Sequence, residues 1–127
     1  MRNINYYKVE KINTVKDIMD LAVKEAGEND AFLYKNGNIV HVTYKQFEQD
    51  INSLGTALLE KNITDSHIAV IGENSYNWIT VYLTALESNG VFVPIDKELT
   101  LSEIVNVLNS SDRYFSILKS LRNMLTK

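Results

Sequence analysis

The stretch HIAVIGENSYNWITVYLTALESNGVFVPI, residues 67–95, decides the fold of this chain. Its first part, 67–71, is a short continuous apolar run, which is typical of a strand buried on both faces of a parallel sheet. Residues 75–88 carry apolar side chains almost all round a helix, which predicts a well-buried helix. A second strand is predicted at 91–95, with Pro94 near its end because proline cannot donate to a strand ladder. This order predicts two parallel strands joined by a right-handed crossover.

The helix predicted at 75–88 has expected ends and an expected apolar surface. Asn74 or Ser75 should cap its start, and Gly90 should supply a left-handed residue after its end. Apolar residues occupy the helix almost all round, with Trp78, Ile79, Tyr82, Leu83 and Leu86 on one side and Val81 and Ala85 beside them.

Before this stretch the sequence predicts a helix and a β-hairpin. Thr14 should cap the helix, with Asp17 in its first turn, and Gly27 should stop it. Asn36-Gly37 lies between two β-rich runs, which predicts a hairpin with positive φ at both turn positions.

A second helix should follow the hairpin and end near Asn62. Thr43 begins a capping box in which the Gln46 side chain reaches back to the Thr43 amide. The apolar stripe of this helix is Phe47, Ile51, Leu54 and Leu58.

After residue 95 the same rhythm continues. Thr100 to Glu103 forms another capping box, and 114–117 predicts a third strand. The chain thus predicts a single α/β domain over 1–127, a small parallel sheet with flanking helices plus an N-terminal β-hairpin. The apolar stripe of the helix after Thr100 is Leu101, Ile104, Val105 and Leu108, and a short closing helix would carry Leu118, Leu121 and Leu125.

Composition excludes several function classes. Thirteen basic and sixteen acidic side chains give a net charge of −3 without a block of like charge, which argues against a nucleic-acid or membrane surface. With no cysteine, thiolate catalysis and disulfides are excluded. Neither a signal peptide nor a transmembrane segment is apparent, so we expect a cytoplasmic location.

The turn GENSYNW, residues 72–78, has the location of a phosphate loop but not its composition. Gly72 stands alone where a dinucleotide fingerprint needs three glycines, and no Lys-Ser or Lys-Thr pair is present for a Walker loop. A capped joint between strand and helix is the favoured interpretation, with a ligand contact as the alternative. Tyr76, Trp78 and Tyr82 are expected in the core, since they fall on an apolar helix.

Other candidate residues also lack a chemical partner in the sequence. His41 and His67 have no acidic or histidine neighbour at metal-ligand spacing. Glu73 and Asp96 each follow a strand, but the adjacent acidic pair of a receiver domain is missing, and Asp96 is expected to turn the chain. The residues alone predict no catalytic, cofactor-binding or metal-binding position.

Several segments, in their order along the chain, carry a family resemblance over about residues 14–112. They are TVKDIMDLA (14–22), AFLYKNGNIVHVTYKQF (31–47), HIAVIGENSYNW (67–78), YLTALESNGVFVPIDKELTLSEI (82–104) and LNSSD (108–112). On these segments the chain resembles the N-terminal subdomain of AMP-forming adenylating enzymes of the acyl-CoA synthetase superfamily, in particular bacterial long-chain fatty-acid–CoA ligases. Two departures are Asp65-Ser66-His67 before the first parallel strand and the loss of likeness beyond Asp112.

The resemblance implies a parent enzyme that converts a fatty acid, ATP and CoA to acyl-CoA, AMP and pyrophosphate, with Mg²⁺ balancing phosphate charge. The family's phosphate loop, adenine motif, ribose-binding Asp and catalytic Lys all lie downstream of the region matched. No catalytic residue is therefore assigned, and no cofactor is expected for the isolated chain. Its expected partner is the remainder of the synthetase.

Two alternatives remain open at this point. The chain could be a stand-alone interaction or dimerisation module, forming a homodimer through sheet edges that a partner domain would otherwise cover. It could also be a small ligand-binding domain that uses the crevice around Asn74 and Asp96.

Overall fold

The computed structural model describes residues 10–110 and 115–117. Four helices and five strands make up this part of the chain. The elements, in order, are α1 (Val15–Ala26), β1 (Asp30–Asn36), β2 (Asn38–Thr43), α2 (Tyr44–Glu60), β3 (His67–Ile71), α3 (Tyr76–Glu87), β4 (Val91–Ile95), α4 (Leu101–Ser110) and β5 (Phe115–Ile117).

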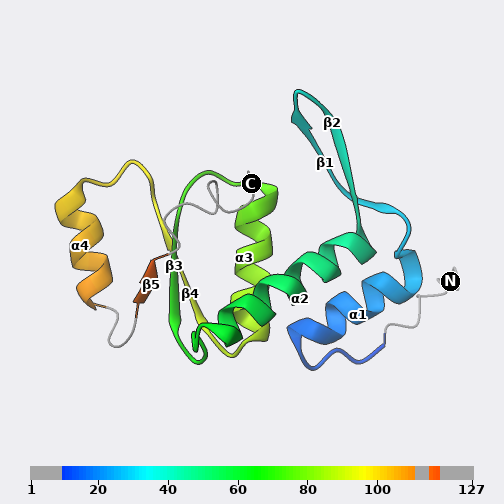
Figure 1. Cartoon of the computed structure of the whole chain (residues 1–127), viewed down its shortest axis with the longest axis horizontal. Coiled ribbons are helices and arrows are strands. Elements are labelled where there is room, and N and C mark those ends of the chain that lie inside the picture. The colour runs from blue at the N-terminus through cyan, green and yellow to red at the C-terminus, as the bar shows by residue number, and fades with distance from the viewer. Residues whose placement is uncertain (1–9, 111–114, 118–127) are drawn as a thin grey trace, which may run out of the picture.

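The three later strands form a parallel sheet in the order β4-β3-β5. His67 at the start of β3 is in register with Val91 of β4 and Phe115 of β5. Helices α2 and α3 lie on one side of these strands and α4 lies on the other (Figure 1). The predicted α/β architecture with its parallel sheet is confirmed.

Strand β3 is the central strand, because β4 and β5 pair with its two edges and its side chains pack against α2 and α3. Its middle residues, Ile68, Ala69 and Val70, are all buried. Pro94 of β4 pairs with Val70 of β3. Because β4 is an edge strand of the described sheet, the missing amide donor of the proline is tolerated there. The core cluster on this side contains Leu58, Ile68, Val70, Val81 and Ala85, with Leu54, Ile63, Trp78 and Phe92 packed against it.

Helix α3 is expected to be buried almost all round, but its burial is concentrated on one face. Its buried residues are Thr80, Val81, Thr84 and Ala85, while the side that includes Trp78 is half-buried. The two threonines tolerate burial because their hydroxyls donate to helix carbonyls at 2.8 Å, Thr80 to Tyr76 and Thr84 to Thr80. Helix α2 covers this face, since Gly55 lies beside the Thr84 methyl group.

A second core cluster joins α1, the hairpin and the first half of α2. Strands β1 and β2 pair antiparallel and project from this end of the molecule (Figure 1). The cluster contains Met19, Val42, Phe47 and Ile51, with Phe32, Val40, Tyr76, Ile79 and Leu83 packed against it.

The hairpin prediction is confirmed, but its turn is tighter than expected. Gly37 has a φ of +72°, whereas Asn36 is still paired with Asn38 as the last residue of β1. The prediction of positive φ at both Asn36 and Gly37 was therefore wrong: of the two, only Gly37 has a positive φ, because strand pairing continues up to the two residues that flank it.

Helix starts follow the predicted caps, with one exception. The Thr14 hydroxyl accepts from the Asp17 amide at 3.1 Å, and Asp17 accepts from the Thr14 amide at 3.0 Å. The Thr43 hydroxyl likewise accepts from the Gln46 amide at 3.1 Å. The Gln46 side chain does not complete the box, because its Nε2 donates to Asp50 at 2.9 Å instead.

The end of α3 also corrects the sequence interpretation. Asn89, with a φ of +56°, takes the left-handed position that was expected for Gly90. The Gly90 amide donates to the Ala85 carbonyl at 2.8 Å. A Cβ on Gly90 would lie 3.0 Å from the carbonyl oxygens of both Ala85 and Ser66, so this glycine permits close backbone approach.

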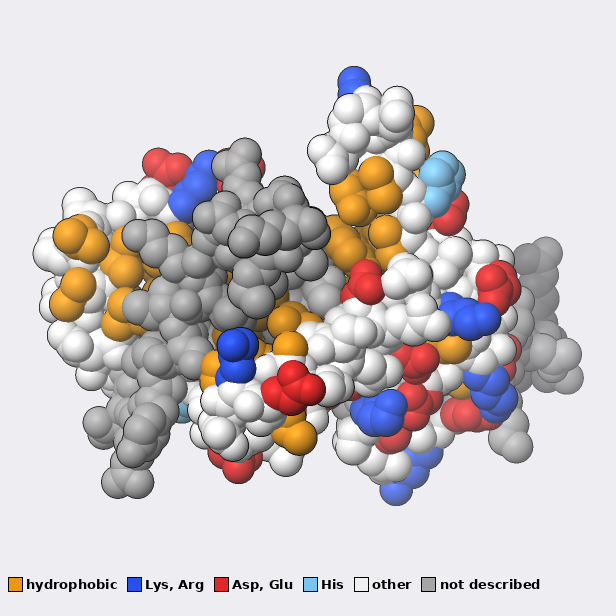
Figure 2. Space-filling view, viewed as in Figure 1, with side chains coloured by type: hydrophobic (Ala, Val, Ile, Leu, Met, Phe, Trp, Pro, Cys, Tyr) orange, Lys and Arg blue, Asp and Glu red, His pale blue; other side chains and the backbone are white. Residues whose placement is uncertain are grey.

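Helix α4 has the predicted capping box and two exposed apolar side chains, Leu101 and Val105. The Thr100 amide donates to Glu103 at 2.8 Å, and the Glu103 amide donates back to the Thr100 hydroxyl at 3.4 Å. No residue of α4 is buried, and Leu101 is 77% exposed. Hydrophobic side chains gather over this helix in Figure 2. The closing helix predicted around Leu118, Leu121 and Leu125, like Tyr114 of the third strand, lies outside the described residues.

Candidate functional site

The turn between β3 and α3 is a capped joint. The Ser75 hydroxyl accepts from the Trp78 amide at 3.2 Å, which identifies Ser75 and not Asn74 as the N-cap. Asn74 is exposed in the turn. The Ser75 cap agrees with the first interpretation of GENSYNW, a capped joint between a strand and a helix.

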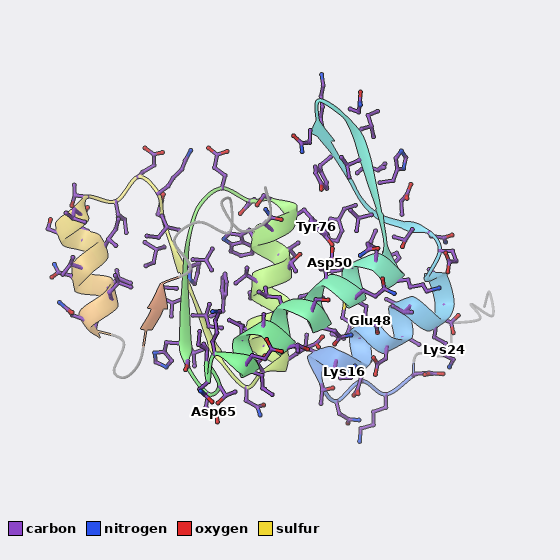
Figure 3. All side chains as sticks on the ribbon, viewed as in Figure 1. Lys16, Lys24, Glu48, Asp50, Asp65 and Tyr76 are labelled. Carbon is purple, nitrogen blue, oxygen red and sulfur yellow. The ribbon has the colours of Figure 1, made fainter. Side chains whose placement is uncertain are left out.

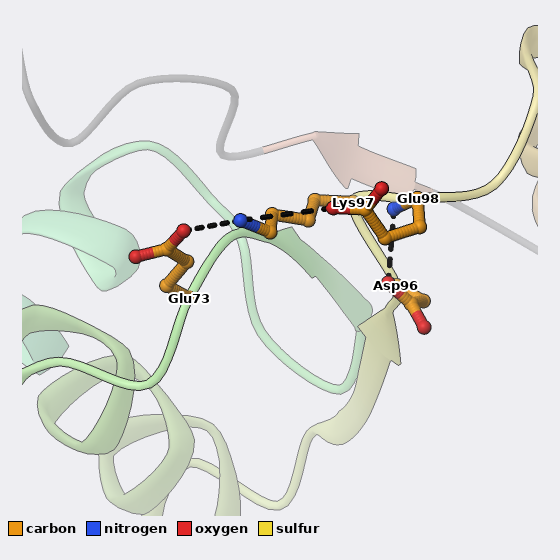
Figure 4. A network of polar contacts seen from close by, with 4 residues as sticks. All are labelled: Glu73, Asp96, Lys97 and Glu98. Carbon is orange, nitrogen blue, oxygen red and sulfur yellow. Dashed lines mark hydrogen bonds and ion pairs between the residues drawn. The ribbon is translucent and has the colours of Figure 1, made fainter.

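An ion pair joins the two loops at the carboxyl edge of the sheet. The Lys97 ammonium, after β4, binds the Glu73 carboxylate, after β3, and lies 3.7 Å from Glu98 (Figure 4). Hydrogen bonding to Lys97 lowers the pKa of Glu73, and the same bond raises the pKa of Lys97. Both side chains are exposed, so solvent screens the pair.

Asp96 has the turn-forming role that the sequence predicted. Its Oδ1 accepts a hydrogen bond from the Glu98 amide at 2.9 Å, and its carbonyl accepts from the Leu99 amide at 3.3 Å. Such a carboxylate replaces a backbone group in a turn. Asp96 is therefore engaged by its own loop.

This edge does not fit a triphosphate or Mg²⁺ site in the part of the chain that the structure describes. Phosphate recognition needs free donors or cations, but Lys97 is paired with Glu73. A Mg²⁺ site needs convergent oxygen ligands, and no group of three or more His, Cys, Asp or Glu residues is placed to hold a metal among the described residues.

The two histidines lie in strands, as predicted, but one has an acidic partner that spacing did not reveal. The Nδ1 of His41, on β2, lies 2.7 Å from the Oδ2 of Asp30, at the start of β1. Antiparallel pairing brings these residues together on an exposed surface. The pair is too small to hold a metal ion on its own.

A polar contact that the sequence analysis missed connects α3 to α2. The Tyr76 hydroxyl donates to the Oδ2 of Asp50 at 2.5 Å, and the Gln46 side chain donates to the other oxygen at 2.9 Å. Burial raises the pKa of Tyr76, with the Asp50 hydrogen bond adding to the effect. The Tyr34 ring, on the hairpin, stacks on Tyr76 with centroids 5.7 Å apart. Figure 3 shows Tyr76 and Asp50 pointing toward one another.

The aromatic residues of α3 are packing residues, as expected. Trp78 stacks on Tyr82 at 5.6 Å, and Phe92 of β4 meets both rings edge-on at 5.0 Å. Because each of these three rings contacts the other two, the group attaches α3 to β4 of the sheet.

A cavity of about 510 Å³ lies at the opposite edge of the sheet, where β3 begins. The second half of α2, the loop before β3 and the end of α3 form its walls. Its rim carries the polar side chains Thr56, Thr64, Asp65, Glu87, Ser88 and Asn89. Sequence reasoning did not find this site, because its residues come from three segments with no common motif.

Comparison with known proteins identifies the family. The AMP-binding enzyme family model matches residues 19–125, which is most of the chain. Tyrocidine synthase 1 of Brevibacillus parabrevis is 33% identical over 82 residues, which cover 64% of this chain and 7% of that protein. The Bacillus subtilis protein YdaB, named as an acyl–CoA ligase, is 33% identical over 72 residues, 56% of this chain and 14% of its own length.

Solved structures show the same fold. The N-terminal subdomain of Klebsiella oxytoca NpsA matches with a TM-score of 0.72 at 19% identity, over 86% of this chain and 29% of that one. A fatty acid AMP ligase from Legionella pneumophila matches with a TM-score of 0.66 at 16% identity, over 77% and 18%. The chain thus spans only a small part of the length of these relatives.

No helix in the described ranges has both the length and the apolar character needed to cross a membrane. With the match over residues 19–125 and the α/β fold, the evidence supports one identification. The chain belongs to the AMP-binding enzyme family and has the fold of the N-terminal part of an adenylation domain.

Proposed function

We propose that this chain is the N-terminal structural part of an ATP-dependent, AMP-forming acid–thiol ligase. The single observation that carries the proposal is the match of residues 19–125 to the AMP-binding enzyme family. The parent reaction would join a carboxylic acid to a thiol through an acyl-adenylate, with release of AMP and pyrophosphate. ATP, Mg²⁺ and CoA would be bound by the remainder of the enzyme, the partner of this chain.

The role of the described residues in that enzyme would be to support its fold. The carboxyl edge of the sheet is occupied by the Glu73–Lys97 pair and by the Asp96 turn. Two packed clusters hold the helices against the sheet and the hairpin. This arrangement supports a scaffold without a catalytic residue of its own.

For the acid, we propose a long-chain fatty acid, in a cytoplasmic enzyme of fatty-acid metabolism. Support comes from the resemblance of the GENSYNW turn and the following strand to long-chain ligases, and from the similarity to YdaB. The competing substrate is an amino acid, since tyrocidine synthase 1 and gramicidin S synthase 2 are also among the relatives.

Carboxylate-dependent ATP–pyrophosphate exchange tests both levels of the proposal. The 127-residue chain alone should give no exchange with any acid, whereas the product of the complete reading frame should exchange with palmitate. Exchange by the chain alone would overturn the scaffold role. Exchange by the longer product with amino acids and not with palmitate would replace the fatty acid but keep the adenylating function.

A second candidate function is a homodimeric interaction module. It is favoured by the apolar side chains Leu101 and Val105 of α4, which are 77% and 43% exposed, and by β4 as an edge strand of the described sheet. Sedimentation velocity over a hundredfold concentration range distinguishes it. A discrete dimer that Leu101→Glu converts to monomer supports the module, and a monomer throughout rejects it.

A further inference from the structure

The cavity at the amino end of β3 has walls with an unusual balance of charge. Asp65 and Glu87 both line it, and none of the described residues in its lining is a Lys, Arg or His. Figure 3 shows Asp65 at the end of the sheet toward which α2 and α3 also run. The C-terminal ends of two helices add partial negative charge there, because the negative ends of the aligned peptide dipoles lie at a helix C-terminus. The local field therefore favours a cation.

Three of the hydroxyl groups that line the cavity donate their hydrogen bond to a backbone carbonyl. Thr56 donates to the Asn52 carbonyl at 2.9 Å, and Ser88 donates to the Thr84 carbonyl at 2.7 Å. Thr84 donates to the Thr80 carbonyl at 2.8 Å. A hydroxyl has one proton, so these groups can offer a ligand only lone pairs. The side-chain amides of Asn52 and Asn89 can present their carbonyl oxygens in the same way.

Glu87 is half-buried and makes no hydrogen bond or ion pair with another described residue within 4 Å. Burial raises its pKa; the charge of Lys16 opposes that effect, while Asp20 and Glu48 add to it. Lys16 is itself bound to Asp20 at 2.9 Å. One cation, Lys16, thus faces three carboxylates, those of Asp20 on α1, Glu48 on α2 and Glu87 on α3.

We propose that this cavity binds a primary ammonium group, with the carboxylates of Glu87 and Asp65 as counter-ions. An ammonium carries three donors and no acceptor, which matches walls that offer acceptors and negative charge. The cavity's 510 Å³ is within the range of small-molecule sites. The ammonium could belong to a free amine or to a lysine of a partner protein. This site is separate from the carboxyl edge of the sheet and does not depend on the proposed ligase function.

Nuclear magnetic resonance of the full ¹⁵N-labelled chain at pH 7 tests the site, with spermidine as the probe at constant ionic strength. We expect saturable shifts of amides at 56, 64–65 and 87–89. Glu87→Gln and Asp65→Asn should each weaken binding about tenfold, the effect of losing one charge-assisted contact. Glu98→Gln, which removes the same charge at the opposite edge, should leave binding unchanged.

Nα-acetyl-lysine methylamide, titrated in parallel, separates the two sources of the ammonium. Binding of spermidine alone assigns the site to free amines, and binding of the lysine derivative assigns it to a protein side chain. The proposal is overturned if neither probe produces saturable shifts. Equal weakening by Glu98→Gln and Glu87→Gln overturns it too, because attraction would then be non-specific. Spectra of the free variants, compared with the wild type, confirm that each is folded.

Discussion

The hydroxyl of Tyr76, in the first turn of α3, donates a 2.5 Å hydrogen bond to the carboxylate of Asp50, in the first half of α2. The same Tyr76 ring stacks on Tyr34 of the hairpin. One side chain thus connects the sheet-bound helix α3 with the two elements that form the other end of the molecule.

Tyr76→Phe should lower the free energy of unfolding by about 1–2 kcal/mol, because it removes a hydrogen bond to a charged group. The loss stays in this range because Gln46 still donates to Asp50. Urea unfolding measures it. Tyr34→Phe is the matched control, since it removes a hydroxyl but keeps ring stacking, and should cost less than about 0.5 kcal/mol. Equal effects of the two variants would contradict a specific role for the Tyr76 hydroxyl.

Alkaline pH should weaken the same connection. The pKa of Tyr76 is raised by burial and by Asp50, so the folded state holds the phenol proton more tightly than the unfolded state does. This stability is complete below the unfolded tyrosine pKa of about 10 and is lost as pH rises from there toward the folded pKa. Wild type should therefore lose stability faster than Tyr76→Phe between about pH 9 and pH 11. Parallel profiles in urea unfolding would refute this.

Gly90→Ala should destabilise the protein by about 1–3 kcal/mol, the usual cost of overpacking. The new Cβ would lie 3.0 Å from two carbonyl oxygens, those of Ala85 and Ser66, which belong to backbone and cannot rotate away. Gly72→Ala is the control, since a Cβ there meets no atom within 4 Å. It should change stability by less than about 0.5 kcal/mol. Thermal unfolding of both variants checks the contrast.

Ser75→Ala should cost about 1 kcal/mol through loss of the cap on the Trp78 amide. Asn74→Ala removes a neighbouring exposed side chain and should have little effect. Chemical unfolding followed by circular dichroism compares them. A larger effect at Asn74 would mean that the turn is organised by the other residue.

The helices and strands could be predicted because their causes lie close together in the sequence. The apolar run of β3, the hydroxyl at Thr14 and the box from Thr100 to Glu103 each act over a few residues. The family resemblance also rests on such local segments, and residues 19–125 match the AMP-binding enzyme family. The finer choice of a fatty acid remains a proposal.

The errors arose where distant segments compete for a group. Gln46 was expected to complete its own cap, but Asp50 binds its side chain one turn further along α2, beside Tyr76. Helix α3 was expected to be buried almost all round, yet its buried face includes Thr80 and Thr84, whose hydroxyls are satisfied within the helix.

The sequence by itself determined the order of elements and the parallel sheet, because periodicity and capping depend on neighbours along the chain. The family was indicated by the resemblance of local segments, and the match over residues 19–125 shows it. Only the tertiary structure decided which side chains meet, Glu73 with Lys97 and Tyr76 with Asp50, and that Asp65 and Glu87 line one cavity. Pairs separated by more than twenty residues leave no local pattern, since their contact depends on how whole helices and strands pack.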